Sequence, residues 1–158
     1  MRRRYCFFDY DGTLRSRALD TIPPSARAAL DKLRENGHFV ALATGRLQSD
    51  ALEMLAPCGI DTMVADGGNS ITIDGKLISI EGMPLAPSRA FVHRLDADGW
   101  AWAVNHENAR TCLTCDERYA SLVSNLYYAP IINPALDIDT LDPIYKVFVP
   151  CKTGEERS

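Results

Sequence analysis

The chain has 158 residues, which is close to the length of one average domain. Apolar residues make up 46% of it, enough for a hydrophobic core, so we expect neither a disordered nor a fibrous protein. The 17 basic and 21 acidic residues leave a net charge of −4, which argues against nucleic acid as a partner. No run of about 18 apolar residues occurs, so we expect no membrane partner.

The first half of the chain alternates short apolar runs with helical patterns. The run up to Phe8 is continuously apolar, which is typical of a parallel strand covered on both faces. Pro23 and Pro24 signal a helix start, and Gly37 signals its end. The expected order is strand, helix, strand, helix, strand. The three strands are expected over residues 4–8, 39–43 and 62–65, and the first helix over 24–36. The second helix has Ala51, Leu52 and Leu55 on one face and ends near 57–59. This order predicts an α/β fold with a parallel sheet and right-handed crossovers.

The second half has a different pattern. Asp74-Gly75 between two short apolar runs predicts a hairpin of residues 70–73 and 76–80. Prolines at 84 and 87 mark a boundary, so we divide the chain into domains 1–83 and 84–158. The second domain reads as α+β, with helices over 88–98 and 117–127 and strands over 100–105, 111–114 and 145–149. The polar tail, 152–158, looks frayed or cut.

Two carboxylates follow the first predicted strand, in the sequence Asp9-Tyr10-Asp11-Gly12. In open α/β sheets ligands bind beyond the carboxyl ends of the strands, so both side chains can project into one crevice. Carboxylate oxygens beside a phosphate are the ligands that Mg²⁺ prefers. An ordinary acidic turn is the alternative interpretation.

The second predicted strand ends in Thr44-Gly45-Arg46. A hydroxyl and the amides around a glycine, next to a helix N-terminus, form an anion site of phosphate size. Thr44 follows Asp9 by the length of one strand–helix–strand crossover, so both turns are expected to face the same crevice.

These paired motifs, Phe7-Phe8-Asp9-Tyr10-Asp11-Gly12-Thr13-Leu14 and Ala41-Leu42-Ala43-Thr44-Gly45-Arg46, resemble the haloacid dehalogenase (HAD) superfamily of phosphohydrolases. The Thr-Gly-Arg form and the predicted inserted domain resemble its Cof-type subgroup with a C2-type cap. The resemblance implies a Rossmann-like HAD core, here a partial parallel sheet, with an inserted and incomplete α+β cap.

The resemblance also implies residue roles and a cofactor. Asp9 would be the nucleophile that forms an aspartyl-phosphate, and Asp11 the general acid and then the base. Thr44, Gly45 and Arg46 would bind the phosphoryl group. The Asp9 carboxylate and the Asp11 main-chain carbonyl would bind Mg²⁺. The substrate would be a small phosphorylated metabolite, of sugar-phosphate or related type.

Two further motifs of the superfamily are not found in this sequence. A lysine on a later strand and an acidic Gly-Asp-x-x-x-Asp motif normally follow the cap, whereas Lys146 lies in a predicted cap strand and Lys152 has no strand context. We therefore expect a chain that stops inside the cap, with weak phosphatase activity and an uncovered sheet edge suited to self-association. The alternatives are a phosphomutase of the same superfamily and a non-catalytic fragment that binds phosphate or a partner chain.

The cysteines indicate a cellular compartment and one more alternative. An odd, sparse set of 5 cysteines favours reduced thiols and a cytoplasmic protein rather than a disulfide framework. Cys112 and Cys115 have redox or zinc spacing, but no second Cys or His pair is placed to complete four zinc ligands. We favour two thiols in a hairpin and keep a thiol–metal module as the alternative.

Overall fold

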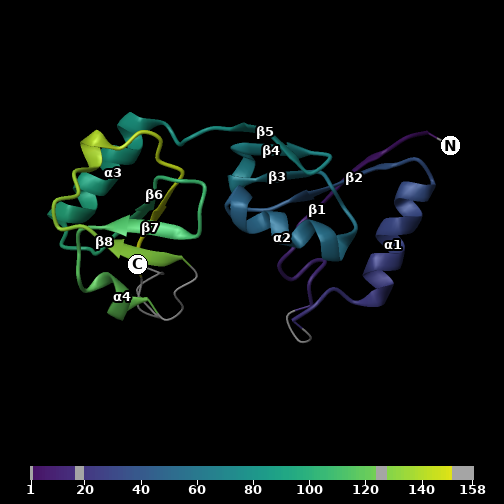
Figure 1. Cartoon of the computed structure of the whole chain (residues 1–158), viewed down its shortest axis with the longest axis horizontal. Coiled ribbons are helices and arrows are strands. Elements are labelled where there is room, and N and C mark those ends of the chain that lie inside the picture. The colour runs from purple at the N-terminus through teal and green to yellow at the C-terminus, as the bar shows by residue number, and fades with distance from the viewer. Residues whose placement is uncertain (1, 17–19, 124–127, 151–158) are drawn as a thin grey trace. The chain divides into compact units, whose positions relative to one another are not determined.

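The computed structural model describes residues 2–16, 20–123 and 128–150. The chain divides into two compact units, Met1–Ile80 and Glu81–Ser158, each with its own sheet (Figure 1). The division lies slightly before the boundary that we predicted between residues 83 and 84. The predicted tail, 152–158, lies outside the described residues.

The first unit contains a sheet in the order β1-β2-β3-β4-β5. Strands β1, β2 and β3 are parallel, and β4 and β5 form an antiparallel hairpin beside them. The α/β class and the parallel sheet are therefore confirmed. The elements are β1 (Tyr5–Phe8), α1 (Pro24–Glu35), β2 (Phe39–Ala43), α2 (Gln48–Cys58), β3 (Met63–Ala65), the 3₁₀ turn η1 (Asp66–Gly68), β4 (Ser70–Ile73) and β5 (Lys76–Ile80).

The helices of this unit begin and end where the sequence signals lie. Pro24 opens α1, where a missing N–H costs no hydrogen bond, and Gly37 follows its end with φ +77°. Gly59 closes α2 with φ +63°, a conformation that favours glycine. Among the described residues, none of the helices is long and apolar enough to cross a membrane.

Helices α1 and α2 cover the same face of the sheet. Leu30 of α1 and Met54 of α2 belong to one buried cluster with Leu42 of β2. Two successive right-handed crossovers that advance in one direction place both helices on one side. Of the three residues predicted to share one face of α2, Ala51 and Leu55 are buried, whereas Leu52 is 40% exposed.

The opposite face of β1 is not covered, so the expectation of a strand buried on both faces is wrong. Tyr5 is 67% exposed and Phe7 is 54% exposed, and both rings pack only loosely on Phe39 at centroid distances of 5.4 and 5.9 Å. The physical reason is that both helices lie on the other face and that β1 is the edge strand of its sheet.

The second unit has a sheet in the order β8-β7-β6-β9 with α3 against one face. Trp102, just before β6, is buried in the core of this unit, whereas Trp100 is partly exposed. The elements are α3 (Leu85–Ala97), β6 (Ala103–Asn105), β7 (Thr111–Thr114), α4 (Tyr119–Leu122), β8 (Ala129–Ile132), the 3₁₀ turn η2 (Ile138–Thr140) and β9 (Lys146–Phe148).

Two elements of this unit differ from the prediction. The helix expected over 117–127 is only the short α4, and residues 124–127 lie outside the described ones. Strand β8 was not predicted, because Pro130 in its centre argues against a strand. Its position at the sheet edge makes that proline acceptable, since an edge strand needs fewer N–H donors.

Candidate active site

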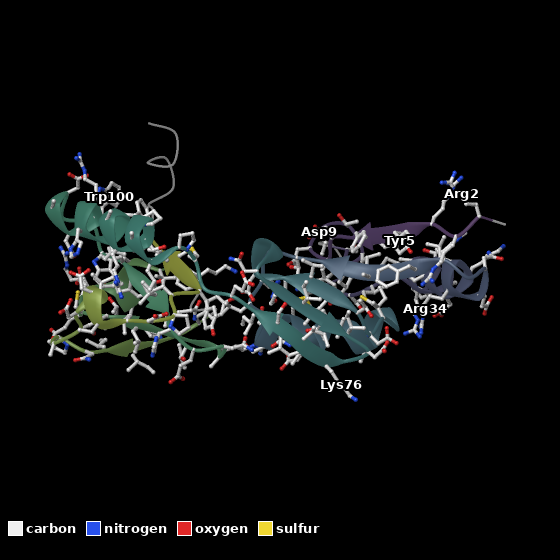
Figure 2. All side chains as sticks on the ribbon, turned by 90° about the horizontal axis from the view of Figure 1, so that it is seen from above. Arg2, Tyr5, Asp9, Arg34, Lys76 and Trp100 are labelled. Carbon is white, nitrogen blue, oxygen red and sulfur yellow. The ribbon has the colours of Figure 1, made fainter. Side chains whose placement is uncertain are left out.

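The carboxyl ends of β1, β2 and β3 bring the predicted site residues to one edge of the sheet. Phe8 pairs with Leu42 and Ala43 pairs with Val64, so the residues that follow these strands emerge side by side. Figure 2 shows Asp9 at the end of β1 that lies away from Arg2. This edge is where open α/β sheets place their ligands.

The turn after β1 is fixed by the carbonyl of Tyr10. This oxygen accepts N–H bonds from Thr13, Leu14 and Arg15 at 3.3, 3.1 and 2.9 Å. Gly12 has φ +84°, a conformation that a side chain would strain, and its own N–H donates to the Arg15 carbonyl at 3.1 Å. The chain therefore turns sharply after Asp11 and leaves the carboxylates at the rim.

Asp9 is exposed at this rim. The Thr13 hydroxyl lies 3.5 Å from Asp9 Oδ2, at the limit of a hydrogen bond. An exposed carboxylate with one weak neutral donor keeps its negative charge accessible, which a nucleophile toward phosphorus requires.

Asp11, by contrast, is held by two arginines. Arg46 donates from Nε to Oδ2 at 2.7 Å and from Nη2 to Oδ1 at 2.9 Å, and Arg15 Nη1 reaches Oδ1 at 3.0 Å. The hydrogen bond from Arg46 is the main cause that lowers the pKa of Asp11, and partial burial opposes it. Asp11 is therefore held as a carboxylate in this arrangement, and it carries no proton that it could donate.

The Thr44-Gly45-Arg46 turn lies beside these carboxylates. The Thr44 hydroxyl accepts the N–H of Arg46 at 3.2 Å, which leaves its hydroxyl proton available to a ligand. A Cβ added at Gly45 would meet no atom within 4 Å, so there is open space beside this backbone. The arginine side chain is turned toward Asp11 and Asp50 rather than into that space.

Three site residues were not found from the sequence. Arg15 is the second partner of Asp11, and Asp50 on α2 lies 3.4 Å from Arg46 Nη1 with a fully buried side chain. Asp66 follows β3 directly and is also buried. Two signals could have indicated them: the four-residue spacing between Arg46, just before a predicted helix, and Asp50 within it, and an acid at the end of a third parallel strand.

The donor set suits part of a Mg²⁺ shell. Asp9 offers a carboxylate and Asp11 a main-chain carbonyl, while the Asp11 side chain is engaged with arginines. Mg²⁺ in phosphate-binding sites is often held by one or two carboxylates together with substrate oxygens and waters, so these donors fit it. Within the described ranges there is no group of three or more His, Cys, Asp or Glu side chains placed to hold a metal.

The two thiols of the Cys-x-x-Cys pair lie apart in the second unit. Cys112 belongs to the cluster with Ala103 and Tyr119, whereas Cys115 packs against the cluster of Val104 on the other side. Burial raises the pKa of both thiols, which makes them poor thiolates. This placement gives no support to the thiol–metal alternative.

Comparison with known proteins places this chain among hydrolases. The family model described as haloacid dehalogenase-like hydrolase matches residues 6–154. The "Putative phosphatase YkrA" of Bacillus subtilis (strain 168) is 27% identical over 96 residues, which cover 61% of this chain and 37% of that protein.

Two solved structures share the fold. A hypothetical protein from Geobacillus kaustophilus HTA426 has a TM-score of 0.72 and 25% identity, covering 98% of this chain and 60% of its own. The HAD subclass IIB sugar phosphatase BT4131 has a TM-score of 0.64 and 21% identity, covering 90% of this chain and 56% of its own. The chain thus spans between 37% and 60% of the length of these relatives.

Proposed function

This chain belongs to the haloacid dehalogenase-like hydrolase family, and we propose that it carries the phosphoryl-binding half of a Mg²⁺-dependent phosphomonoester hydrolase. The observation that carries this proposal is the meeting of an exposed Asp9, an arginine-paired Asp11 and the open Gly45 turn at one sheet edge. A small phosphorylated metabolite is the proposed substrate, and the sugar phosphatase with the same fold supports a sugar phosphate.

The proposed reaction uses the side chains in two steps. An Asp9 oxygen attacks phosphorus and the bond to the leaving oxygen breaks, while that oxygen takes a proton from Asp11. Water then attacks the aspartyl-phosphate, its proton passes to Asp11, and the bond between Asp9 and phosphorus breaks to release phosphate. Thr44 and Gly45 hold the phosphoryl oxygens throughout. The Asp9 carboxylate and the Asp11 main-chain carbonyl would hold Mg²⁺, which would supply positive charge to offset the charge of the phosphate.

The first of these steps requires a change at Asp11. The structure has this carboxylate paired with Arg46, the state that accepts protons, whereas the leaving oxygen needs a proton donor. A bound phosphate dianion is an alternative partner for a guanidinium. We propose that the substrate phosphate draws Arg46 from Asp11. Arg15 then remains as the partner of Asp11, and the weaker hold on the carboxylate allows it to be protonated.

We expect slow turnover from this chain alone. In the described part of the first unit the lysines are Lys32 on α1 and Lys76 at the start of β5. Lys76 lies at the opposite end of the sheet from Asp9, because the N–H of the adjoining Gly75 donates to the carbonyl of Asp61, which precedes β3. No lysine in this described part can neutralise the pair of Asp9 and phosphate. Hydrolysis of p-nitrophenyl phosphate with Mg²⁺ is expected below about 1 per second, with an EDTA-treated sample as control. Turnover between about 1 and 1,000 per second would contradict this expectation.

A binding role has one observation in its favour, the open outer edge of β1. Arg2–Arg4 precede this strand and Asp9 and Asp11 follow it, so antiparallel pairing of two copies sets opposite charges side by side. The exposed rings of Tyr5 and Phe7 would cover each other in the same contact. We therefore propose that a second copy of this chain pairs along this edge.

Self-association through β1 should depend on Phe7. Sedimentation velocity over a range of concentrations is expected to show a dimer that Phe7→Lys weakens, because a lysine on an edge strand opposes pairing. Phe91→Lys is the matched control, since Phe91 on α3 is 50% exposed but lies in the other unit. A monomer at every concentration, or equal effects of both substitutions, would contradict the proposal.

The proposed setting is the cytoplasm. Cys6, Cys58, Cys112 and Cys115 are all free thiols, as a reducing compartment favours. Nothing in the charge of the chain favours a nucleic-acid partner, since its net charge is −4.

A further inference from the structure

Asp66 holds an unusual position next to the proposed phosphate turn. It is the first residue after β3, has φ +55°, and is only 6% exposed. Side chains other than glycine rarely adopt this backbone conformation, although Asp and Asn tolerate it best. A buried carboxylate on such a backbone persists only where its surroundings require it.

Three hydrogen bonds join this corner to the end of β2. The Asp66 N–H donates to the Arg46 carbonyl at 2.8 Å, and the N–H of Gly67 donates to the Thr44 carbonyl at 3.3 Å. The Asp66 Oδ2 accepts the N–H of Gln48 at 3.1 Å. The segment from Thr44 to Gln48 is thus held at its beginning, middle and end from residues 66 and 67.

The contact with Gln48 also completes helix α2. The residue at its N-cap position is Leu47, which has no side-chain oxygen to bind the first amides. Asp66 supplies this oxygen from another strand, and its negative charge faces the positive end of the helix. The helix start is therefore capped by the protein, and an incoming phosphate is left to Thr44 and Gly45.

We infer that Asp66 is a positioning residue, which fixes the Thr44-Gly45-Arg46 turn in the shape that receives a phosphoryl group. The inference rests on the proposed function for its ligand, but not for its effect on the turn. The left-handed backbone at Asp66 directs the N–H groups of residues 66 and 67 toward the carbonyls of Arg46 and Thr44. The Asp66 carboxylate accepts the N–H of Gln48.

The test compares substitutions at Asp66 with one at Asp74. Asp66→Asn retains an acceptor oxygen and the backbone preference, whereas Asp66→Gly retains only the backbone freedom. Asp66→Ala loses both. Asp74→Ala is the matched control, because Asp74 has φ +50° in the β4–β5 hairpin turn and makes the same kind of backbone strain away from the site.

Two readouts are measured on the whole chain: the dissociation constant for inorganic phosphate by titration calorimetry, and amide hydrogen exchange of residues 44–48 without ligand. Asp66→Ala and Asp66→Gly should weaken phosphate binding at least about fivefold, the factor that corresponds to one lost capping hydrogen bond. Both should also speed exchange in that segment. Asp66→Asn and Asp74→Ala should remain near the wild-type values.

The outcomes separate this inference from the proposed function. Wild-type exchange rates and phosphate affinity in Asp66→Gly, a variant that glycine's backbone freedom allows to fold, would overturn the inference. If the wild-type chain binds no phosphate, the proposed function fails, and the exchange of residues 44–48 still decides the role of Asp66.

Discussion

Replacing Asp9 with asparagine is expected to abolish Mg²⁺-dependent release of phosphate by this chain. The amide lacks the negative charge that attacks phosphorus, and loss of a nucleophile lowers turnover by at least about 1,000-fold. Asp9 is exposed and its one described donor is the Thr13 hydroxyl at 3.5 Å, so the substitution should leave stability almost unchanged. Phosphate release and thermal unfolding of the two proteins provide the measurement.

A covalent readout makes this prediction independent of slow turnover. Acetyl phosphate should place a phosphoryl group on the peptide that contains Asp9, and mass spectrometry should find none in Asp9→Asn. Asp74→Asn is the control, because it changes another aspartate of the same unit at the β4–β5 turn. Undiminished phosphate release by Asp9→Asn would contradict the nucleophile assignment and with it the proposed function.

The sequence predicts those parts of the fold that local chemistry decides. Each local signal requires a particular backbone conformation, which the structure has at that position. These signals are the prolines at the start of α1, the glycines after α1 and α2, and the Asp74-Gly75 turn. The strand ends that carry Asp9 and Thr44 could be placed for the same reason, since each follows a short apolar run bounded by a turn.

Features that depend on the neighbours of a residue in space could not be predicted this way. Continuous apolarity in β1 indicated burial on both faces, but both crossover helices lie on one face and leave Phe7 exposed. The same holds for the site: Asp66 acts through contacts with a segment that lies about 20 residues earlier in the chain. The contact of Asp66 with Gln48 is visible only in the folded structure.

Arg46→Ala should be the most destabilising substitution at the site. The Arg46 guanidinium joins Asp11 after β1 to Asp50 on α2, and the Asp50 side chain is 0% exposed. Breaking a buried pair leaves a carboxylate without its compensating charge, and because Arg46 is itself partly exposed we expect a loss of about 2–3 kcal/mol. For a unit of this size that loss lowers Tm by roughly 10–20 °C, which calorimetry of the first unit's transition would measure.

Asp50→Asn in the Arg46→Ala background should recover part of this loss, because it removes the buried charge that the arginine compensated. The matched control is Arg94→Ala: Arg94 and Asp98 also form a pair four residues apart, at 2.7 Å, but the arginine is 75% exposed. Its loss should cost no more than about 0.5 kcal/mol. Equal effects of the two alanine substitutions, or no recovery in the double variant, would contradict this prediction. The pairing of Arg46 with Asp50 would then add nothing to the stability of the sheet edge.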